Sequence, residues 1–216
     1  MPLLSEYGFG EGSGTTTADS SGSGYTLTSS GSPWTASGKT GAGTTGAGGA
    51  FAGRVAPNTS QTAWTVMCWV KFTTAPGGNW YAVVVDNDTG TVYFEANGAN
   101  GSIFLTCNGV DTAHSLSTGI WYHIAISRTQ AFVNGVASGS STSGSAVNWG
   151  PNANFSVGRG GGDSDFDGVI DDLRLFSDTL DAATVTSWMN TPVGGGSVTS
   201  SYGFWMPPPR RIVRIR

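Results

Sequence analysis

The chain has 216 residues, which is long enough for one all-β domain that buries a sizeable core without disulfides or metals. Its 34 glycines would suit a disordered chain, but eight tryptophans and ten phenylalanines exclude that class, so we assign the glycines to turns between short strands. Four of the ten basic residues lie after Pro209, so residues 1–209 carry six basic against fourteen acidic groups, which excludes a nucleic-acid surface there.

The first fifty residues are poor in strand signals. Residues 1–28 predict an edge strand followed by a polar loop. Residues 29–50 are almost entirely Gly, Ser, Thr and Ala, and they predict a long loop that becomes ordered only against a partner. The N-terminus has neither a basic region nor an apolar run of secretory length, so we expect no signal peptide. No window is apolar enough for a membrane span.

The middle of the chain has the two-residue period of strands. The alternation from Trp64 to Phe72 predicts a strand covered on both faces, and residues 81–85 and 91–95 predict a hairpin. Strands are also expected at 102–107 and 120–127, with Ile120 on the same face as the later isoleucines. Cys68 and Cys107 fall in these strands, either as small buried hydrophobes or, if the strands are neighbours, as a disulfide.

The last third contains the clearest local motifs. Asn134-Gly135 predicts a tight hairpin, and residues 154–157 predict a short strand. Asp181 is expected to cap a short helix that buries one face. After Asn190 the composition changes, so we divide the chain into a domain of residues 1–190, a Gly/Ser linker of residues 191–201 and a basic arm of residues 202–216.

Four segments, in this order, resemble the laminin G-like jelly rolls of the concanavalin A-like lectin and glucanase family. They are Tyr7–Gly14 with Asp19–Gly22, Trp64–Lys71, Trp121–Arg128 with Phe132–Gly135, and Phe166–Phe176 with Leu180–Ala183. The resemblance implies an all-β fold, a two-sheet antiparallel jelly-roll sandwich with one short C-terminal helix, from which an extended C-terminal arm continues. It does not fix the function, because this fold carries lectins, adhesion modules, hydrolases and virion parts.

The resemblance also implies a metal site. In such sandwiches a structural calcium often ties the N-terminal segment to the final strand, and the matching residues here are Glu11, Asp19, Asp171 and Asp172. Carboxylate oxygens suit calcium, whereas zinc would need His or Cys clusters. Neighbours in a strand point to opposite faces, so at most one of Asp171 and Asp172 is a ligand unless a bulge intervenes. Residues 163–168 also match the start of a calcium loop, or form a solvated acidic turn.

Catalysis has little support in the sequence. His123 lies within a predicted strand and is interpreted as a packed or edge polar residue. Asp86 and Asp88 have the spacing of a glycosidase acid pair, but the residues around them predict a turn. No serine or cysteine nucleophile lies in a recognisable motif. We therefore expect that the protein is not an enzyme.

Aromatic residues in or beside polar loops are the remaining candidates for ligand contact. They are, with the neighbouring amide, Trp34, Asn79, Trp80, Tyr81 and Trp149. Three interpretations stay open: a glycan-binding rim, a protein interface, or aromatic rings that fold back onto the sandwich.

The C-terminal arm combines a polyproline run, Pro207–Pro209, with aromatic and basic residues. These are Tyr202, Phe204, Trp205, Arg210, Arg211, Arg214 and Arg216. Such a strip could add as a strand to an acidic partner, or it could be a solvated tail.

Two hypotheses of function follow. The first is a non-enzymatic phage virion surface protein, a capsid decoration or head-fibre protein, made in the host cytoplasm without a signal peptide. Its lectin-like module would face outward, and its basic arm would bind a capsid or other virion protein. The alternative is a carbohydrate-binding or adhesion module that recognises cell-surface glycans. The oligomeric state, including a homo-oligomer, stays open.

Overall fold

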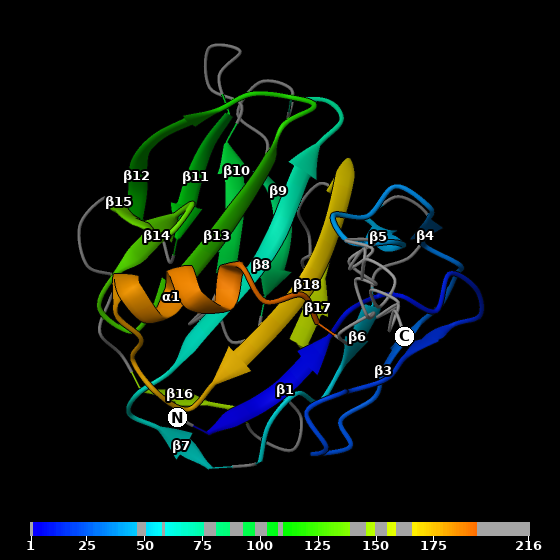
Figure 1. Ribbon diagram of the computed structural model, residues 1–216, viewed down its shortest axis with the longest axis horizontal. Coiled ribbons are helices and arrows are strands. Elements are labelled where there is room, and N and C mark those ends of the chain that lie inside the picture. The colour runs from blue at the N-terminus through cyan, green and yellow to red at the C-terminus, as the bar shows by residue number, and fades with distance from the viewer. Residues whose placement is uncertain are drawn as a thin grey trace, which may run out of the picture.

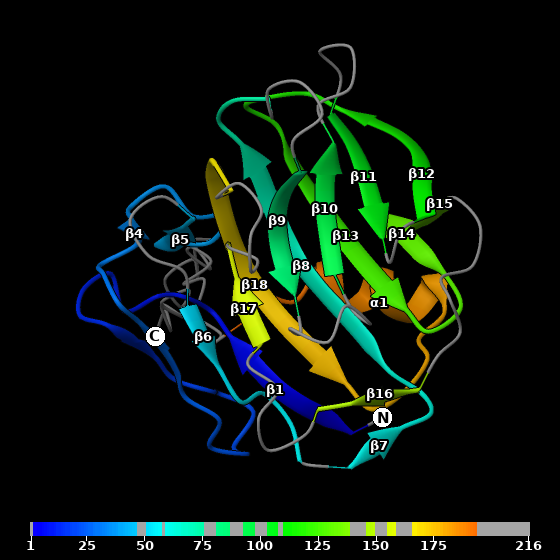
Figure 2. The same cartoon turned by 180° about the vertical axis from the view of Figure 1, so that it is seen from behind.

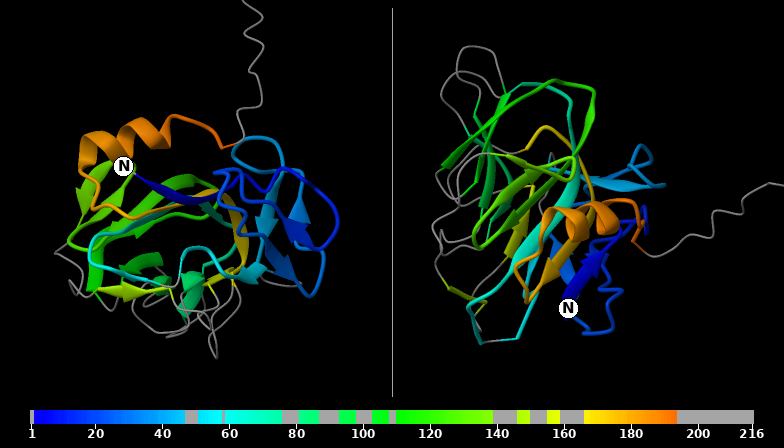
Figure 3. Two further views of the ribbon diagram at one scale, coloured as in Figure 1. Left: turned by 90° about the horizontal axis from the view of Figure 1, so that it is seen from below. Right: turned by 60° about the vertical axis from the view of Figure 1, so that its left-hand side comes forward.

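The computed structural model describes residues 2–46, 51–57, 59–75, 81–86, 93–97, 103–107, 110–138, 146–149, 155–158 and 166–193. Two antiparallel sheets face each other across the core, as the two side views show (Figure 3). This arrangement is the two-sheet sandwich that the sequence predicted.

The first sheet contains the longest strands and carries the single helix of the described part of the chain on its outer face (Figure 1). Its strands are β15 (Val136–Ser138), β14 (Ala131–Val133), β13 (Trp121–Ser127), β8 (Thr65–Phe72), β18 (Gly168–Phe176), β5 (Gly43–Thr45) and β4 (Trp34–Thr35), in that order. The other edge of β18 is shared, because β5 pairs with its first half and β1 (Leu3–Tyr7) pairs with its second half. Strand β18 is therefore buried along its whole length.

The second sheet lies behind the first in Figure 1 and on the near side in Figure 2. Its order is β12 (Val110–Leu116), β11 (Ile103–Cys107), β10 (Tyr93–Asn97), β9 (Tyr81–Asp86), β17 (Phe155–Val157), β6 (Phe51–Gly53), β3 (Leu27–Ser29) and β2 (Thr16–Thr17). Strands β7 (Ser60–Gln61) and β16 (Val147–Asn148) form a separate pair. The predicted hairpin of residues 81–85 and 91–95 is confirmed as the antiparallel pair β9 and β10.

The core forms where the alternating residues of the two sheets meet. On β8, Val66, Cys68, Val70 and Phe72 are fully buried in the main cluster, as the sequence alternation predicted. On the other face, Met67 belongs to a second cluster, so this face of β8 is covered at Met67, whereas Trp69 and Lys71 are half-buried. At about 25 cal/mol per Å² of apolar surface, this burial is the main source of stability.

The second cluster lies beneath α1 (Ala182–Met189). Asp181 begins the helix as predicted, because its carboxylate accepts a hydrogen bond from the Thr184 N–H at 2.8 Å. Val185 is buried, and the Trp188 ring packs on Phe176 at a centroid distance of 5.2 Å. The helix therefore covers one end of the outer face of the first sheet.

The turn at Asn134-Gly135 is confirmed as a two-residue hairpin between β14 and β15. Both residues have positive φ angles, 50° and 78°, which is the conformation of a type I′ turn. Strand β13 begins at Trp121 rather than at residue 120, and the Ile120 side chain is 52% exposed. Ile120 was predicted to share one face of this strand with Ile124 and Ile126, but it lies outside the strand and is exposed, whereas the other two are fully buried.

The interpretation of residues 29–50 as a loop that orders only against a partner is also wrong for residues 29–46. Strands β4 and β5 form here and extend the first sheet through β18. The Thr44 hydroxyl donates to the Pro33 carbonyl at 3.0 Å, and the Trp34 ring packs edge-on against Phe51. Small residues permit this close packing, and their lack of apolar periodicity conceals the strands in the sequence.

Cys68 is a free, buried cysteine of the first sheet, whereas Cys107 lies on β11 of the second sheet. Burial raises the pKa of the Cys68 thiol, and the nearby Asp171 carboxylate raises it further. The interpretation of Cys68 as a small buried hydrophobe is thus confirmed. In the described part of the chain, no helix has the length and apolar character needed to cross a membrane.

Candidate functional site

The predicted acidic residues of the N-terminal segment organise that segment themselves. The Asp19 carboxylate accepts hydrogen bonds from the backbone N–H groups of Glu6 at 2.9 Å, Ser21 at 2.9 Å and Tyr25 at 3.2 Å. The Glu11 carboxylate accepts from the Ala18 N–H at 2.8 Å and from the Thr17 hydroxyl. Both carboxylates therefore hold loop backbone in place.

Asp171 and Asp172 lie where β18 bulges, between its pairing with the first and second halves of β8. Asp172 has a φ of 50°, so the strand alternation is interrupted at this residue. Asp171 is fully buried, and its carboxylate accepts from the Thr40 N–H at 2.9 Å. The Asp172 carboxylate accepts from the Val193 N–H at 3.0 Å. The bulge thus lets two consecutive acids anchor two different chain segments.

Burial dominates the protonation of these acids. It raises the pKa of Asp171 to about 7, partly opposed by the N–H groups that its carboxylate accepts from. Burial also raises the pKa of Asp172, again partly opposed by the hydrogen bond from Val193 and by the Arg174 charge. Burial thus makes both carboxyls harder to ionise than an exposed aspartate.

The four acids predicted to bind calcium do not form a shared cluster. Among the residues that the structure describes, no three His, Cys, Asp or Glu side chains are close enough to hold a metal ion together. Asp19 binds the loop that contains it, while Asp171 and Asp172 bind Thr40 and Val193. The arrangement does not fit a calcium ion held by all four carboxylates, and calcium binding stays a prediction. Residues 163–165 of the alternative calcium loop lie outside the described residues.

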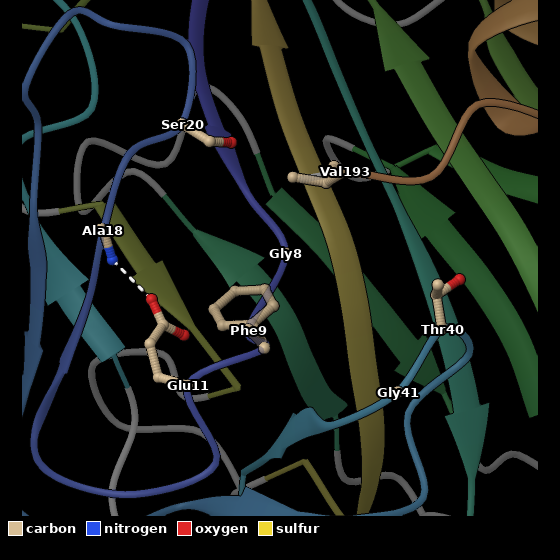
Figure 4. Close-up of a pocket in the computed structure, with 9 residues that line it drawn as sticks. Gly8, Phe9, Glu11, Ala18, Ser20, Thr40, Gly41 and Val193 are labelled. Carbon is tan, nitrogen blue, oxygen red and sulfur yellow. Dashed lines mark hydrogen bonds between the residues drawn. The ribbon is translucent and has the colours of Figure 1, made fainter. Parts of the chain in front are cut away.

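A pocket of about 530 Å³ opens where these anchored segments meet (Figure 4). The N-terminal segment forms one side, and the turn at Thr40 and the segment after α1 at Val193 form the other (Figure 4). The lining residues are Gly8, Phe9, Gly10, Glu11, Ala18, Ser20, Thr40, Gly41 and Val193. The lining is mostly apolar, and two hydroxyls and one carboxylate are its polar side-chain groups. This is the usual character of a small-ligand pocket.

Phe9 is one of the residues that line this pocket (Figure 4). Its ring is fully buried, and it packs against Phe51 at a centroid distance of 5.7 Å. Its φ of 47° is in the left-handed region, which non-glycine residues seldom adopt and which is common near ligand sites. Sequence reasoning found Glu11 but missed Ser20, Thr40 and Val193, because three distant segments meet here and no local motif indicates it.

The predicted aromatic contacts do not gather into one rim. Trp149 is 1% exposed and packs against Phe155, so its assignment to a contact surface is corrected: burial leaves its ring no free face. Trp34 is half-buried, with its ring against Phe51 and its Nε1–H donating to the Gly14 carbonyl at 2.7 Å. Both rings fold back onto the sandwich, which was one of the three interpretations. Asn79, Trp80 and the side chain of Tyr81 lie outside the described residues.

His123, interpreted as a packed or edge polar residue, is 1% exposed and is therefore packed. Burial lowers its pKa to about 3, and the Arg174 charge lowers it further, so the ring is neutral. The pocket lining contains a single carboxylate, Glu11, and no second acid faces it among the lining residues. The side chains of Asp86 and Asp88 and the arm at 202–216 lie outside the described residues.

Comparisons with known proteins agree with the geometry of the sandwich. Residues 44–186 match the family described as the concanavalin A-like lectin/glucanases superfamily. No curated protein matches the chain. Among solved structures, domain 4 of AbnA, an extracellular arabinanase from Geobacillus stearothermophilus solved with arabinotriose, matches with a TM-score of 0.59 and 22% identity. The match covers 86% of this chain and 97% of that domain.

Two toxin structures also match. The binding domain of Paraclostridial Mosquitocidal Protein 1 has a TM-score of 0.63 and 13% identity, over 88% of this chain and 53% of that one. A structure of botulinum neurotoxin type C, whose cell entry is described as dependent on two ganglioside molecules, has a TM-score of 0.55 and 11% identity, over 87% and 50%. The chain thus spans about half the length of these toxin structures. At such identities the likeness shows the fold.

Proposed function

This chain belongs to the concanavalin A-like lectin/glucanases superfamily, and we propose that it is a non-enzymatic module that binds carbohydrate. The observation that carries the proposal is the pocket between the N-terminal segment, Thr40 and Val193. Its glycine backbone and hydroxyls can exchange hydrogen bonds with sugar hydroxyls, and its apolar wall at Val193 can cover a sugar ring.

The single carboxylate of the pocket supports binding rather than hydrolysis. Glycoside hydrolysis by the common mechanisms needs two carboxyl groups on opposite sides of the scissile bond. Glu11 is the acid of the lining, and its carboxylate already accepts hydrogen bonds from Ala18 and Thr17. The matched arabinanase domain, solved with an arabinose oligosaccharide, and the matched toxin binding domain are compatible with such a role.

A glycan array followed by titration calorimetry tests the proposal. Gly10 suits a blocking substitution, because a Cβ atom there would meet nothing within 4 Å. Gly10→Phe should fill the pocket and abolish binding of the oligosaccharide selected on the array. Ser187→Leu, at an exposed position of α1, is the matched control and should bind as the parent does. Binding that survives in Gly10→Phe would remove the pocket from the proposal, and an array without any ligand would remove the function.

A phage virion surface role is our second proposal, and it is supported by the sequence of the arm alone. Arg210, Arg211, Arg214 and Arg216 give residues 202–216 a strong positive charge beside an acidic body. A chain ending at Ser201 should lose copurification with phage capsids, and replacement of the four arginines by serine should weaken attachment and its salt dependence. Unchanged capsid attachment of the shortened chain would contradict this role for the arm.

A further inference from the structure

The whole chain contains two lysines, Lys39 and Lys71, and each lies over a tryptophan ring on the outer face of the first sheet. The Lys39 Nζ is 4.1 Å from the Trp69 ring centroid, and the Lys71 Nζ is 4.9 Å from the Trp121 ring centroid. In a chain with more acidic than basic residues, this placement concentrates positive charge at one location.

Strand register places both pairs in one patch. Lys71 on β8 lies opposite Trp121 on β13, and Trp69 lies opposite His123. Trp69 and Trp121 are therefore diagonal neighbours on adjacent strands, which are typically about 7–8 Å apart. The helix α1 packs on the same face over Met67, and Trp69 and Lys71 do not belong to the cluster beneath the helix.

The position of Lys39 is fixed by the structure of its turn. The buried Asp171 carboxylate accepts from the N–H of the next residue, Thr40, at 2.9 Å, and the Gly38 N–H donates to the Gly41 carbonyl at 3.0 Å. A Cβ atom at Gly38 would lie 2.1 Å from the Ala42 carbonyl oxygen and 2.8 Å from the Asp171 carboxylate. Only glycine fits this close approach, and the turn consequently holds Lys39 above Trp69.

The patch remains accessible. Lys39 is exposed, and Trp69, Lys71 and Trp121 are half-buried. Ile120, beside Trp121, is 52% exposed and continues the apolar surface. A lysine ammonium over an exposed indole is held weakly and on a flexible stem, so it can move to a carboxylate and leave the ring face to an apolar partner.

We propose that this lysine–tryptophan patch is a second binding surface, which takes acidic polysaccharides that contain uronic acid units. Each indole provides a face for the C–H side of a sugar ring, and each ammonium pairs with the carboxylate of that sugar. A neutral glycan gains the stacking without the ion pairs, and an acidic peptide lacks the flat apolar face. This patch is a separate site from the pocket. The proposal rests on the proposed function only in assuming that the ligand is a carbohydrate.

Affinity electrophoresis and calorimetry with polygalacturonate, alginate and hyaluronan, each beside its carboxyl-reduced form, test the proposal. The parent protein should bind at least one acidic polymer at least about tenfold more tightly than the reduced polymer, and added salt should weaken that binding. Lys39→Gln with Lys71→Gln should lose most of this preference. Trp121→Ala should weaken binding at every salt concentration.

The matched control is Arg54→Gln with Arg128→Gln, which removes the same charge elsewhere, including an arginine over the Tyr25 ring at 5.5 Å. It should keep the preference, and melting curves confirm that each variant is folded. Equal binding by the lysine variant and the control, or no preference of the parent for acidic polymers, overturns the proposal. Gly10→Phe separates the two sites: it should remove ligand from the pocket and leave the acidic preference intact.

Discussion

The Arg174 guanidinium donates a hydrogen bond to the Glu6 carboxylate at 2.8 Å and so joins the last strand of the sandwich to the first. Arg174 is 1% exposed, and it also donates to the backbone carbonyls of Trp188 and Thr191 at the end of α1. One buried cation therefore connects β1, β18 and the chain that leaves the helix. Removal of a partner would leave a charge without compensation in a dry environment.

Glu6→Ala should consequently lower the free energy of unfolding by about 3 kcal/mol, because Arg174 would stay buried without its carboxylate. Urea titration followed by tryptophan fluorescence measures the loss. Glu11→Ala is the control, because Glu11 is exposed and bonded within its own loop, and it should lose no more than about 1 kcal/mol. Equal losses in the two variants would contradict the role of the buried pair.

Gly135 and Gly119 provide a test of how the β14–β15 hairpin contacts the helix. Their φ angles are nearly equal, 78° and 76°, so alanine introduces similar backbone strain of about 1–2 kcal/mol at both. A Cβ at Gly135 would also lie 2.3 Å from the Thr186 hydroxyl of α1, whereas a Cβ at Gly119 meets nothing within 4 Å. Gly135→Ala should therefore be clearly more destabilising than Gly119→Ala in thermal melts.

A second comparison isolates the contact. Thr186→Gly removes the side chain that the new Cβ would meet, so Gly135→Ala in that background should lose its excess over Gly119→Ala. If the excess persists, the hairpin is sensitive for a reason other than its contact with α1.

The sequence predicts the strands with apolar alternation and the turns with special backbone angles. Val66 to Phe72 alternate, Asn134-Gly135 needs positive φ and Asp181 can cap a helix, so each of these follows from local chemistry. Strands β4 and β5 could not be predicted, because Gly43 and Thr44 have no apolar pattern and become strand only by pairing with β18.

The site was harder to predict from the sequence, because it too depends on tertiary pairing rather than on local sequence. Asp171 and Asp172 were recognised as a motif, but the bulge that sends them to Thr40 and Val193 depends on tertiary pairing with β8 and β1. Trp149 was predicted to be an exposed aromatic residue of a polar loop, but its ring is buried against Phe155. The polarity of a segment does not determine the direction in which a large ring points.

His123 should make the fold sensitive to mild acid. Among the residues that the structure describes, neither of its ring nitrogens has a hydrogen-bond partner, and burial lowers its pKa to about 3 from an ordinary value near 6.5. The unfolded chain therefore binds a proton below about pH 6.5 that the folded chain does not bind. The contribution of neutral His123 to the free energy of unfolding is fully present above that pH. It is lost as the pH falls toward 3, by at most about 1.4 kcal/mol per pH unit.

His123→Phe should remove this contribution, because phenylalanine does not titrate. Its ring can keep the edge contact that the His123 ring makes with Trp69 at a centroid distance of 5.3 Å. The difference in unfolding free energy between the variant and the parent should grow between pH 6.5 and pH 4.5. At pH 8 the variant should be at least as stable, since no hydrogen bond of the ring is lost. A difference that is constant with pH would show that His123 binds a proton in the folded chain as readily as in the unfolded chain.

The boundary of the folded domain should lie after Val193 rather than at residue 190. Thr191 provides a carbonyl to Arg174, the Val193 N–H donates to Asp172, and the Val193 side chain is buried near Gly8.

A chain ending at Gly196 should therefore have a free energy of unfolding within about 0.5 kcal/mol of that of the full chain, whereas a chain ending at Asn190 should lose about 2–4 kcal/mol. Its buried Asp172 would lose the Val193 N–H, and Arg174 would lose one of its acceptors, the Thr191 carbonyl. Val193→Ser in the longer chain should reproduce only the apolar part of the loss. If the chain ending at Asn190 is as stable as the longer one in urea, the contacts of residues 191–193 do not contribute to the sandwich, and the wall that Val193 gives the pocket is marginal to the fold.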